Sequence, residues 1–326
     1  MKRSKVFVPG LILAVLLGFS GWNSAVAETI TLKLATYDPK TAVTVSAIPK
    51  LIKLVEEKSK GKLKIDWIGG PEITPGRKQP AAVQKGVLDM SVAWAYVLHV
   101  KAAQAMHLSR LTPPEERKSG LYDLFVEEFA KAGFRYLGRT TTATPYVLVS
   151  TKKAEKPEDM KGLGFRTSGI YEPIIERAGG RKVRVASPEV YSALQRGLID
   201  VRPAPMGTVV DGKLYEVLKY WVGPGFFPSQ NTVLCVNLKK FNSLPADLQK
   251  VLVDAMAEVE KDLTGLKTKE FEAAWQVAQK NGMVRNEWPK DVTESFYNDV
   301  MKKSWERVEK GLGKELIDKM RPLMGG

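Results

Sequence analysis

An arginine stands at the end of a predicted strand near the middle of the chain. Residues 163–166 read as a short strand, and Arg166 is followed by Thr167-Ser168-Gly169, which we expect to lead into the next helix. A guanidinium fork can give a carboxylate two parallel charge-assisted hydrogen bonds, and the amides at a helix N-terminus add further donors. Arg166 is therefore a candidate carboxylate clamp. The alternative is a structural ion pair.

A second arginine, Arg202, follows the strand predicted over residues 198–201. In open α/β sheets, ligands bind beyond the carboxyl ends of the strands, so Arg202 and Arg166 are expected to face one cleft. We expect Arg202 to influence the choice between mono- and diacids. The alternative is an ion pair with Asp200 or Glu172.

Aromatic residues could form apolar walls for the same cleft. The candidates are Tyr37, Trp94, Tyr96, Tyr146, Trp221, Phe226 and Phe227. Tyr37 follows the strand predicted over residues 29–35, next to Asp38. Trp94 and Tyr96 follow the strand predicted over residues 87–93. For each aromatic the alternative is packing in the hydrophobic core.

Signatures of cofactor sites and catalytic triads are missing from the sequence. There is no G-x-G-x-x-G fingerprint, phosphate loop, G-x-S-x-G elbow or C-x-x-C pair. His99 and His107 have no carboxylate partners in the local sequence, so a metal site is not expected. Cys235 lies in an apolar run that is typical of a core thiol. We expect no cofactor and no catalysis.

The composition is that of an ordinary globular protein. The 326 residues are 44% hydrophobic and 26% charged, with a net charge of +14. The basic residues alternate with acidic ones and form no RNA- or DNA-binding motif, so nucleic acid is not an expected partner. A positive field suits the attraction of small anionic ligands.

The N-terminus has the pattern of a signal peptide. Lys2, Arg3 and Lys5 precede an apolar run over residues 6–19, and Ala25-Val26-Ala27 is an A-x-A cleavage site. We expect residues 1–27 to be removed and the mature protein, with no second long apolar run, to lie in the periplasm and not in the membrane. An uncleaved anchor is the alternative. Removing these three basic residues and no acidic one would lower the net charge from +14 to +11.

Strands and helices alternate along the rest of the chain. After the strands named above, the pattern predicts a strand over residues 63–67 and a helix over residues 115–132. Later, apolar residues at helical spacing over 248–266 predict one long amphipathic helix. This order indicates an α/β fold with largely parallel sheets.

A short internal sequence repeat indicates two lobes. Residues 82–90 (AVQKGVLDM) and 193–201 (ALQRGLIDV) share a helix, a glycine and a strand start. We expect residues 28–144 to form the first part of lobe I and residues 145–228 to form lobe II. Residues 229–326 would return to lobe I through a strand at 232–237 and add the long helix.

Several segments resemble a known family. Residues 156–166 (KPEDMKGLGFR), 189–200 (EVYSALQRGLID) and 244–249 (LPADLQ) are similar, in this order, to segments of the solute-binding proteins of tripartite ATP-independent periplasmic (TRAP) transporters of the dicarboxylate-binding type. The resemblance implies a two-lobe periplasmic-binding-protein fold with a ligand cleft between the lobes and a long C-terminal helix crossing them. It also implies an organic acid as ligand, a membrane permease as partner, and Arg166 as the carboxylate clamp.

The sequence departs from this family's pattern at three places. Tyr146 stands where many members have a second arginine, Arg202 replaces a neutral polar residue, and Gly225 stands where some members have an asparagine. A monocarboxylate with an apolar or aromatic body is therefore at least as well suited as a C4-dicarboxylate. The leading hypothesis is an exported receptor that delivers an organic acid to a TRAP permease. The alternatives are a ligand-sensing module for a membrane receptor and a periplasmic enzyme.

Overall fold

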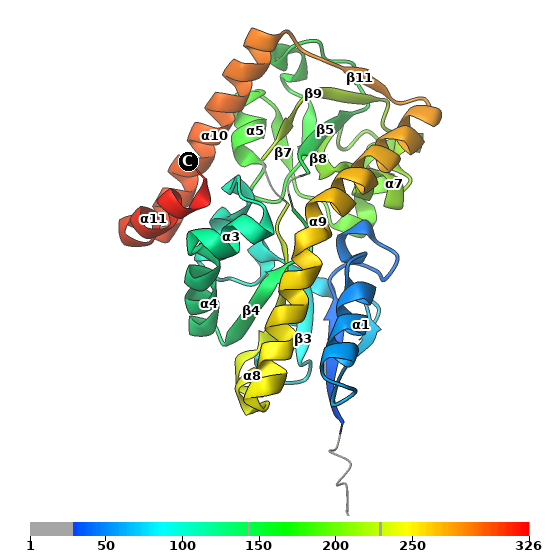
Figure 1. Cartoon of the computed structure of the whole chain (residues 1–326). Coiled ribbons are helices and arrows are strands. Elements are labelled where there is room, and N and C mark those ends of the chain that lie inside the picture. The colour runs from blue at the N-terminus through cyan, green and yellow to red at the C-terminus, as the bar shows by residue number, and fades with distance from the viewer. Residues whose placement is uncertain (1–28, 143, 228–229, 326) are drawn as a thin grey trace, which may run out of the picture.

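The fold is built on two mixed β-sheets. We analysed a computed structural model that describes residues 29–142, 144–227 and 230–325, so the predicted signal peptide lies outside the described residues. Figure 1 shows the two sheets one above the other, with long helices running past both. The predicted α/β class is confirmed.

The first sheet has the strand order β2-β1-β3-β10-β4. Its strands are β1 (Ile30–Thr36), β2 (Leu63–Gly69), β3 (Met90–Trp94), β4 (Phe134–Arg139) and β10 (Thr232–Asn237). Strand β1 is parallel to β2 and β3, whereas β10 is antiparallel to β3 and β4. Because β1 and β3 are parallel, the residues that follow them lie at the same edge of this sheet.

Helices cover both faces of the first sheet. Helix α1 (Ile48–Lys58) and the first half of α9 (Ala246–Lys280) pack on one face, over Leu32 and Leu34 of β1. Helices α2 (Gln79–Gln84) and α4 (Leu121–Lys131) contribute to the core on the other face. The burial of β1 alternates at its start, where one face is open to solvent, and becomes continuous from Leu34 to Thr36, where both faces are covered.

The second sheet has the order β11-β9-β5-β8-β6-β7. Its strands are β5 (Tyr146–Ser150), β6 (Gly164–Arg166), β7 (Arg181–Val183), β8 (Val201–Pro205), β9 (Tyr220–Phe226) and β11 (Val284–Asn286). Strand β5 is antiparallel to β8 and β9, and β6 is parallel to β7 and β8. Helices α5 (Glu172–Arg177) and α10 (Lys290–Leu312) pack on one side, and α6 (Val190–Gln195) and α7 (Met206–Asp211) on the other.

The long helix α9 joins the two halves. Its 35 residues extend about 50 Å at 1.5 Å per residue. Leu248 and Leu263 are buried in the core of the first sheet, whereas Ala274 and Ala278 are buried in the core of the second. The predicted long helix is therefore confirmed, and it continues past the predicted end to span both sheets. The remaining helices are α3 (Pro113–Ser119), α8 (Leu238–Ser243) and α11 (Lys314–Met320).

Three local predictions differ from the structure. The helix predicted over residues 115–132 is two helices, because Gly120 adopts a left-handed conformation with φ +88° between α3 and α4. The strand predicted from residue 87 begins at Met90. The strand predicted over residues 198–201 begins at Val201, which places Arg202 inside β8 and not after it.

A buried ionic cluster connects α3 to the first sheet. Arg139 at the end of β4 is fully buried and donates from Nε to Glu116 of α3 at 2.6 Å. The Tyr136 hydroxyl donates to the other oxygen of the same carboxylate at 2.7 Å. On the α9 side, Glu260 accepts the backbone N–H of Arg139 at 2.8 Å and forms an ion pair with Arg117. Each buried charge thus has an oppositely charged partner, as burial requires.

Replacing Glu116 tests this cluster. Glu116→Ala leaves the buried guanidinium of Arg139 without its carboxylate partner, and we expect the free energy of unfolding to fall by about 3–5 kcal/mol. Urea denaturation followed by circular dichroism measures this. The control is Asp254→Ala, which removes an exposed ion pair with Lys250 and should cost less than about 0.5 kcal/mol. Equal losses in the two variants would contradict the assigned role of Glu116.

Candidate functional site

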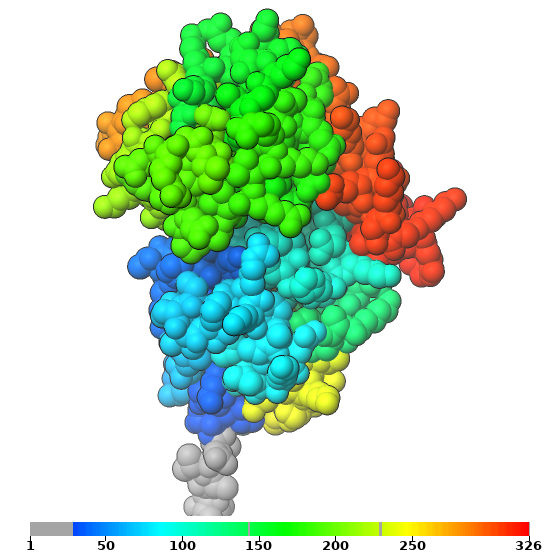
Figure 2. Space-filling view, turned by 180° about the vertical axis from the view of Figure 1, so that it is seen from behind, coloured from blue at the N-terminus to red at the C-terminus, as the bar shows by residue number. Residues whose placement is uncertain are grey.

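A small cavity of about 140 Å³ lies where the two sheets face each other. The first-sheet half contributes Tyr37, Asp38, Thr44, Trp94 and Tyr96, and the second-sheet half contributes Arg166, Tyr171, Ser187, Arg202, Thr208 and Asp211. Figure 2 shows the outer face of this boundary, with the green half of the molecule resting on the blue and cyan half. The structure therefore brings together Tyr37, Trp94, Tyr96, Arg166 and Arg202 from the residues selected in the sequence.

The strand ends explain why the first-sheet residues meet. Strand β1 ends at Thr36 and β3 ends at Trp94, and the two strands are parallel neighbours. Gln79 supports this edge, because its side-chain amide donates to the carbonyl of Thr36 at 2.8 Å and its oxygen accepts from the Ser91 hydroxyl at 2.9 Å. Asp38 is thus held at the carboxyl end of the sheet, where ligands of α/β proteins bind.

Arg166 is the last residue of β6, and its side chain is only 7% exposed. Its Nε donates to the carbonyl of Val185 at 3.4 Å, and one terminal nitrogen donates to the Ser187 hydroxyl at 3.3 Å. Both acceptors are neutral, and no carboxylate among the described residues lies within ion-pair distance of Arg166. The structural ion pair considered for this arginine is therefore not found in the described part of the chain.

The turn after Arg166 leads into the next helix, as expected. Helix α5 starts at Glu172, and the intervening turn contains Gly169 in a left-handed conformation with φ +82°. This turn carries Tyr171 into the lining of the cavity. The second-sheet wall near Arg166 is therefore formed by a loop and an aromatic ring.

Arg202 enters the cavity from the neighbouring strand β8. One terminal nitrogen donates to the Thr208 hydroxyl at 3.3 Å, whereas the buried Nε has no hydrogen-bond partner. Burial, together with the positive charge of Arg166, lowers the pKa of Arg202 to about 10. Two cations therefore share one small space.

The two carboxylates considered as ion-pair partners of Arg202 contact other groups instead. Glu172 is paired with Lys182 at 3.1 Å and with Arg307 at 2.8 Å. Asp200 accepts the backbone N–H of Gly164 at 2.9 Å. Both carboxylates that could have neutralised Arg202 are thus engaged outside the cavity.

Asp38 is, with Asp211, one of two acidic residues that line the cavity. Its carboxylate accepts from the Thr44 hydroxyl at 2.7 Å, and the side chain is partly buried. Burial raises the pKa of Asp38, while the donors Thr44 and Trp94 and the charge of Arg202 lower it. Asp38 and Arg202 are not in direct ion-pair contact, so each presents its charge to the space between them.

Several cavity residues were not selected from the sequence. Tyr171, Ser187, Thr208 and Asp211 line the cavity from loops and helix ends of the second half. In the sequence, Ser187 could have been selected because Ser187-Pro188 is typical of a helix start, and Asp38 because it follows the first predicted strand. Thr208 and Asp211 follow a strand end that was predicted too early, so their proximity could not be read from the pattern.

The aromatic residues divide into two groups. Trp94 and Tyr96 line the cavity with ring centroids 6.4 Å apart, and Tyr37 lies beside them. Tyr146 lies behind this wall, where its ring packs against Tyr171 at 5.8 Å and its hydroxyl donates to Asn231 at 3.3 Å. Tyr146 therefore supports a cavity residue and does not line the cavity.

Trp221 and Phe226 lie elsewhere, which corrects their expected place in the cleft. Trp221 packs against Phe271 and Trp275 of α9, with Arg285 over its ring at 4.3 Å. Phe226 packs against Phe296 of α10. The reason is that β9 is covered by α9 on one face and by α10 on the other, so its aromatic side chains fill the core.

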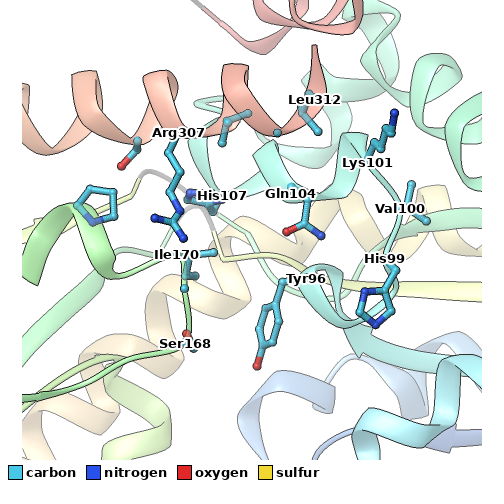
Figure 3. A pocket seen from close by; sticks show the side chains of 15 residues that line it. Tyr96, His99, Val100, Lys101, Gln104, His107, Ser168, Ile170, Arg307 and Leu312 are labelled. Carbon is cyan, nitrogen blue, oxygen red and sulfur yellow. The ribbon is translucent and has the colours of Figure 1, made fainter. Parts of the chain in front are cut away.

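A larger cavity of about 550 Å³ begins on the far side of Tyr96. Figure 3 shows Arg307 and Leu312 reaching into it from α10, with Gln104 and Ser168 across from them. His107 lies deep in this cavity against Phe227, and burial lowers the pKa of His107 to about 3. Within the described residues no group of three or more His, Cys, Asp or Glu side chains could hold a metal ion. Nor is any helix in the ranges covered by the structure long and apolar enough to cross a membrane.

Comparison with known proteins gives the family. Residues 34–311 match the family of bacterial extracellular solute-binding proteins, family 7 (DctP). The chain is 25% identical over 282 residues to the C4-dicarboxylate-binding periplasmic protein DctP of Rhodobacter capsulatus, which covers 79% of this chain and 80% of that protein. It is 26% identical over 246 residues to a monocarboxylate 2-oxoacid-binding periplasmic protein of Nostoc sp., which covers 72% of this chain and 66% of that protein.

Solved structures agree on the fold. A TRAP periplasmic solute-binding protein from Desulfovibrio salexigens with bound orotic acid has a TM-score of 0.78 at 21% identity, covering 91% of this chain and 99% of that one. The extracytoplasmic solute receptor DctP7 of Bordetella pertussis, which binds pyroglutamic acid, has a TM-score of 0.77 at 18% identity, covering 90% of this chain and all of that one. The protein thus has the two-lobe periplasmic-binding fold, and it belongs to family 7 of the bacterial extracellular solute-binding proteins.

Proposed function

We propose that this protein is a periplasmic receptor that binds an organic acid through its carboxylate and delivers it to the membrane subunits of a TRAP transporter. One observation carries the proposal: Arg166 and Arg202 face a single small cavity between the lobes, and neither has a carboxylate partner there. Two guanidinium groups that share a low-dielectric space repel each other, and a bound carboxylate removes this repulsion.

The second positive charge expected from the family pattern comes from a different residue in this chain. Tyr146 stands where many members have an arginine, and its hydroxyl donates to Asn231 behind the cavity. Arg202 supplies the second positive charge from another strand. The cavity therefore keeps two cations while the geometry around the carboxylate changes, which suits a ligand different from a C4-dicarboxylate.

The size of the cavity favours a small acid. Its volume of about 140 Å³ is bounded by Trp94, Tyr96 and Tyr171, whose rings provide apolar walls. Similar proteins are named for binding a 2-oxoacid, pyroglutamic acid and orotic acid, each of which carries one carboxylate. We therefore propose a monocarboxylate with a compact apolar or cyclic body.

The hydroxyl groups at the cavity suit binding and not nucleophilic attack. Ser187 and Thr208 accept hydrogen bonds from Arg166 and Arg202, and Thr44 donates to Asp38. The hydroxyls of Ser187 and Thr208 have no carboxylate or imidazole partner among the described residues, whereas Thr44 is hydrogen-bonded to the Asp38 carboxylate. The proposed role is therefore capture and release without chemical change of the acid.

Binding is proposed to close two lobes. We assign residues 28–144 to lobe I and residues 145–228 to lobe II; residues 229–326 return to lobe I through β10 and also supply β11 and α10 to the sheet of lobe II. Val43 of the short helix η1 (Val43–Val45) touches α7 of lobe II, and its N–H donates to Asp211 at 3.4 Å. A Cβ atom on Gly207 of α7 would lie only 2.3 Å from a methyl carbon of Val43. The lobes therefore meet closely at Gly207, where the chain has no side chain.

Replacing Arg166 tests the carboxylate clamp. Arg166→Ala should weaken binding of the preferred acid by about a hundred- to several-thousand-fold, because roughly 3–5 kcal/mol is lost when a buried charge is unpaired. Arg166→Lys should recover part of the affinity, because it restores the charge without the fork. The measurement is calorimetric titration with 3-methyl-2-oxobutanoate, pyroglutamate and orotate. Arg196→Ala, which removes an exposed arginine, is the matched control. Binding by Arg166→Ala within threefold of the parent would refute the clamp.

Replacing Gly207 tests closure. Gly207→Ala should weaken binding of the same acid by about 5- to 150-fold. Overpacking at the lobe contact costs about 1–3 kcal/mol, and this cost arises only in the closed state. The melting temperature without ligand should not fall, since alanine favours a helix. Val43→Ala in the same chain should restore affinity by making room for the new methyl group. Gly265→Ala on α9, where a Cβ meets nothing within 4 Å, is the control. Failure of the double variant to recover would argue against closure at this contact.

Export is tested by the mass of the mature chain. We propose cleavage after Ala27, and intact mass spectrometry of the periplasmic fraction should show a chain that begins at Glu28. A full-length mass in the membrane pellet would instead indicate the uncleaved anchor.

A further inference from the structure

Asp38 and Arg202 face each other across the cavity without touching. Asp38 comes from the end of β1 in the first half, and Arg202 from β8 in the second half. Both side chains line the same 140 Å³ space, and no ion pair joins them. A small ligand held by Arg166 thus has an acidic group on one side and a second cation on the other.

The hydrogen-bonding capacity of Asp38 is not filled. Its Oδ2 accepts from Thr44 at 2.7 Å, and Trp94 is a second neighbouring donor. An ionised carboxylate has about four acceptor positions and no donor. Since burial already disfavours its charge, a further donor from the ligand stabilises Asp38, whereas a ligand acceptor facing it is repelled.

Arg202, by contrast, lacks hydrogen-bond acceptors. Its Nε is buried without a hydrogen-bond partner, and only one terminal nitrogen is engaged, with Thr208. A buried unsatisfied donor costs about 1–3 kcal/mol, which an acceptor from the ligand would remove. A hydroxyl group can accept from Arg202 and donate to Asp38 at the same time.

The charges point to the same class of ligand. Arg166 and Arg202 supply two positive charges, and Asp38 and Asp211 are the acidic residues of the same cavity. Because acidic groups already face the two arginines, the second carboxylate of a diacid would be placed near Asp38. Like charges brought together in a cavity of low dielectric are destabilising.

We infer that Asp38 is a specificity residue that selects monocarboxylates bearing a hydrogen-bond donor, such as a hydroxyl, next to the carboxylate, and that it rejects diacids. The inference rests on the proposed function and deepens it. Arg166 holds the carboxylate, and the donor lies between Asp38 and Arg202.

Three matched acids and one diacid test the inference. The acids are 2-hydroxy-3-methylbutanoate, which carries a donor, 3-methyl-2-oxobutanoate, which carries only an acceptor at the same carbon, and 3-methylbutanoate, which carries neither. Succinate is the diacid. Calorimetric titration of the wild type should show the hydroxy acid bound at least tenfold more tightly than the oxo acid, with succinate weakest.

Asp38→Asn should change this order while keeping the fold. The amide has an N–H that can donate to the oxo group, so the hydroxy-to-oxo preference should fall to within about threefold. Binding of succinate should strengthen at least tenfold, because the negative charge is removed. Asp38→Ala is the second variant, and it should also lose the preference for the hydroxy acid. Glu72→Gln is the control, since it neutralises an exposed carboxylate outside the cavity, which accepts the Gly70 N–H.

The outcomes separate this inference from the proposed function. If acids bind in an Arg166-dependent manner but Asp38→Asn keeps the wild-type order, the inference is overturned and the receptor function stands. If none of the acids binds the wild type, both are overturned. Melting temperatures of the two Asp38 variants within a few degrees of the wild type show that any change in order is not due to unfolding.

Discussion

The repulsion between two buried guanidinium groups is the constraint around which the site is organised. Arg166 and Arg202 lie on neighbouring strands of one sheet and are held by neutral acceptors, the Val185 carbonyl and the hydroxyls of Ser187 and Thr208. A protein carboxylate in ion-pair contact with both arginines would neutralise them permanently and would remove the electrostatic gain from binding an anion. Asp38 and Asp211 line the same cavity but form no ion pair with either arginine, so an anion that binds both guanidinium groups still gains from the relief of this repulsion.

The frame must hold these cations in place while the two halves approach each other. Helix α9 contributes to both cores, and the buried cluster around Arg139 and Glu260 connects it to β4. Beside α9, Val43 contacts Gly207, where a side chain as small as alanine already interferes, and Lys267 of α9 donates to the carbonyl of Val43. We propose that the lobes close through small contacts of this kind, while buried ion pairs hold the rest of the frame.

We propose that ligand choice can change within a constant fold when the second arginine of the site comes from another strand. Tyr146 of β5 lies behind the cavity wall, and Arg202 of β8 projects into the cavity instead. The total positive charge is kept, but the second cation approaches from a different strand and stands opposite Asp38. A small movement of charge within the same sheet thus alters which groups of an acid are favoured.

The sequence by itself determined the α/β class, the long C-terminal helix and the presence of Arg166 at a strand end, because apolar periodicity and strand-end position are local properties. It also marked Tyr37, Trp94 and Tyr96, which follow parallel neighbours β1 and β3. Only the tertiary structure decided that Trp221 and Phe226 are core residues, since this depends on helices α9 and α10 covering β9. It alone set Asp38 opposite Arg202, because the two come from different sheets and their distance depends on how the lobes pack, which no local pattern encodes.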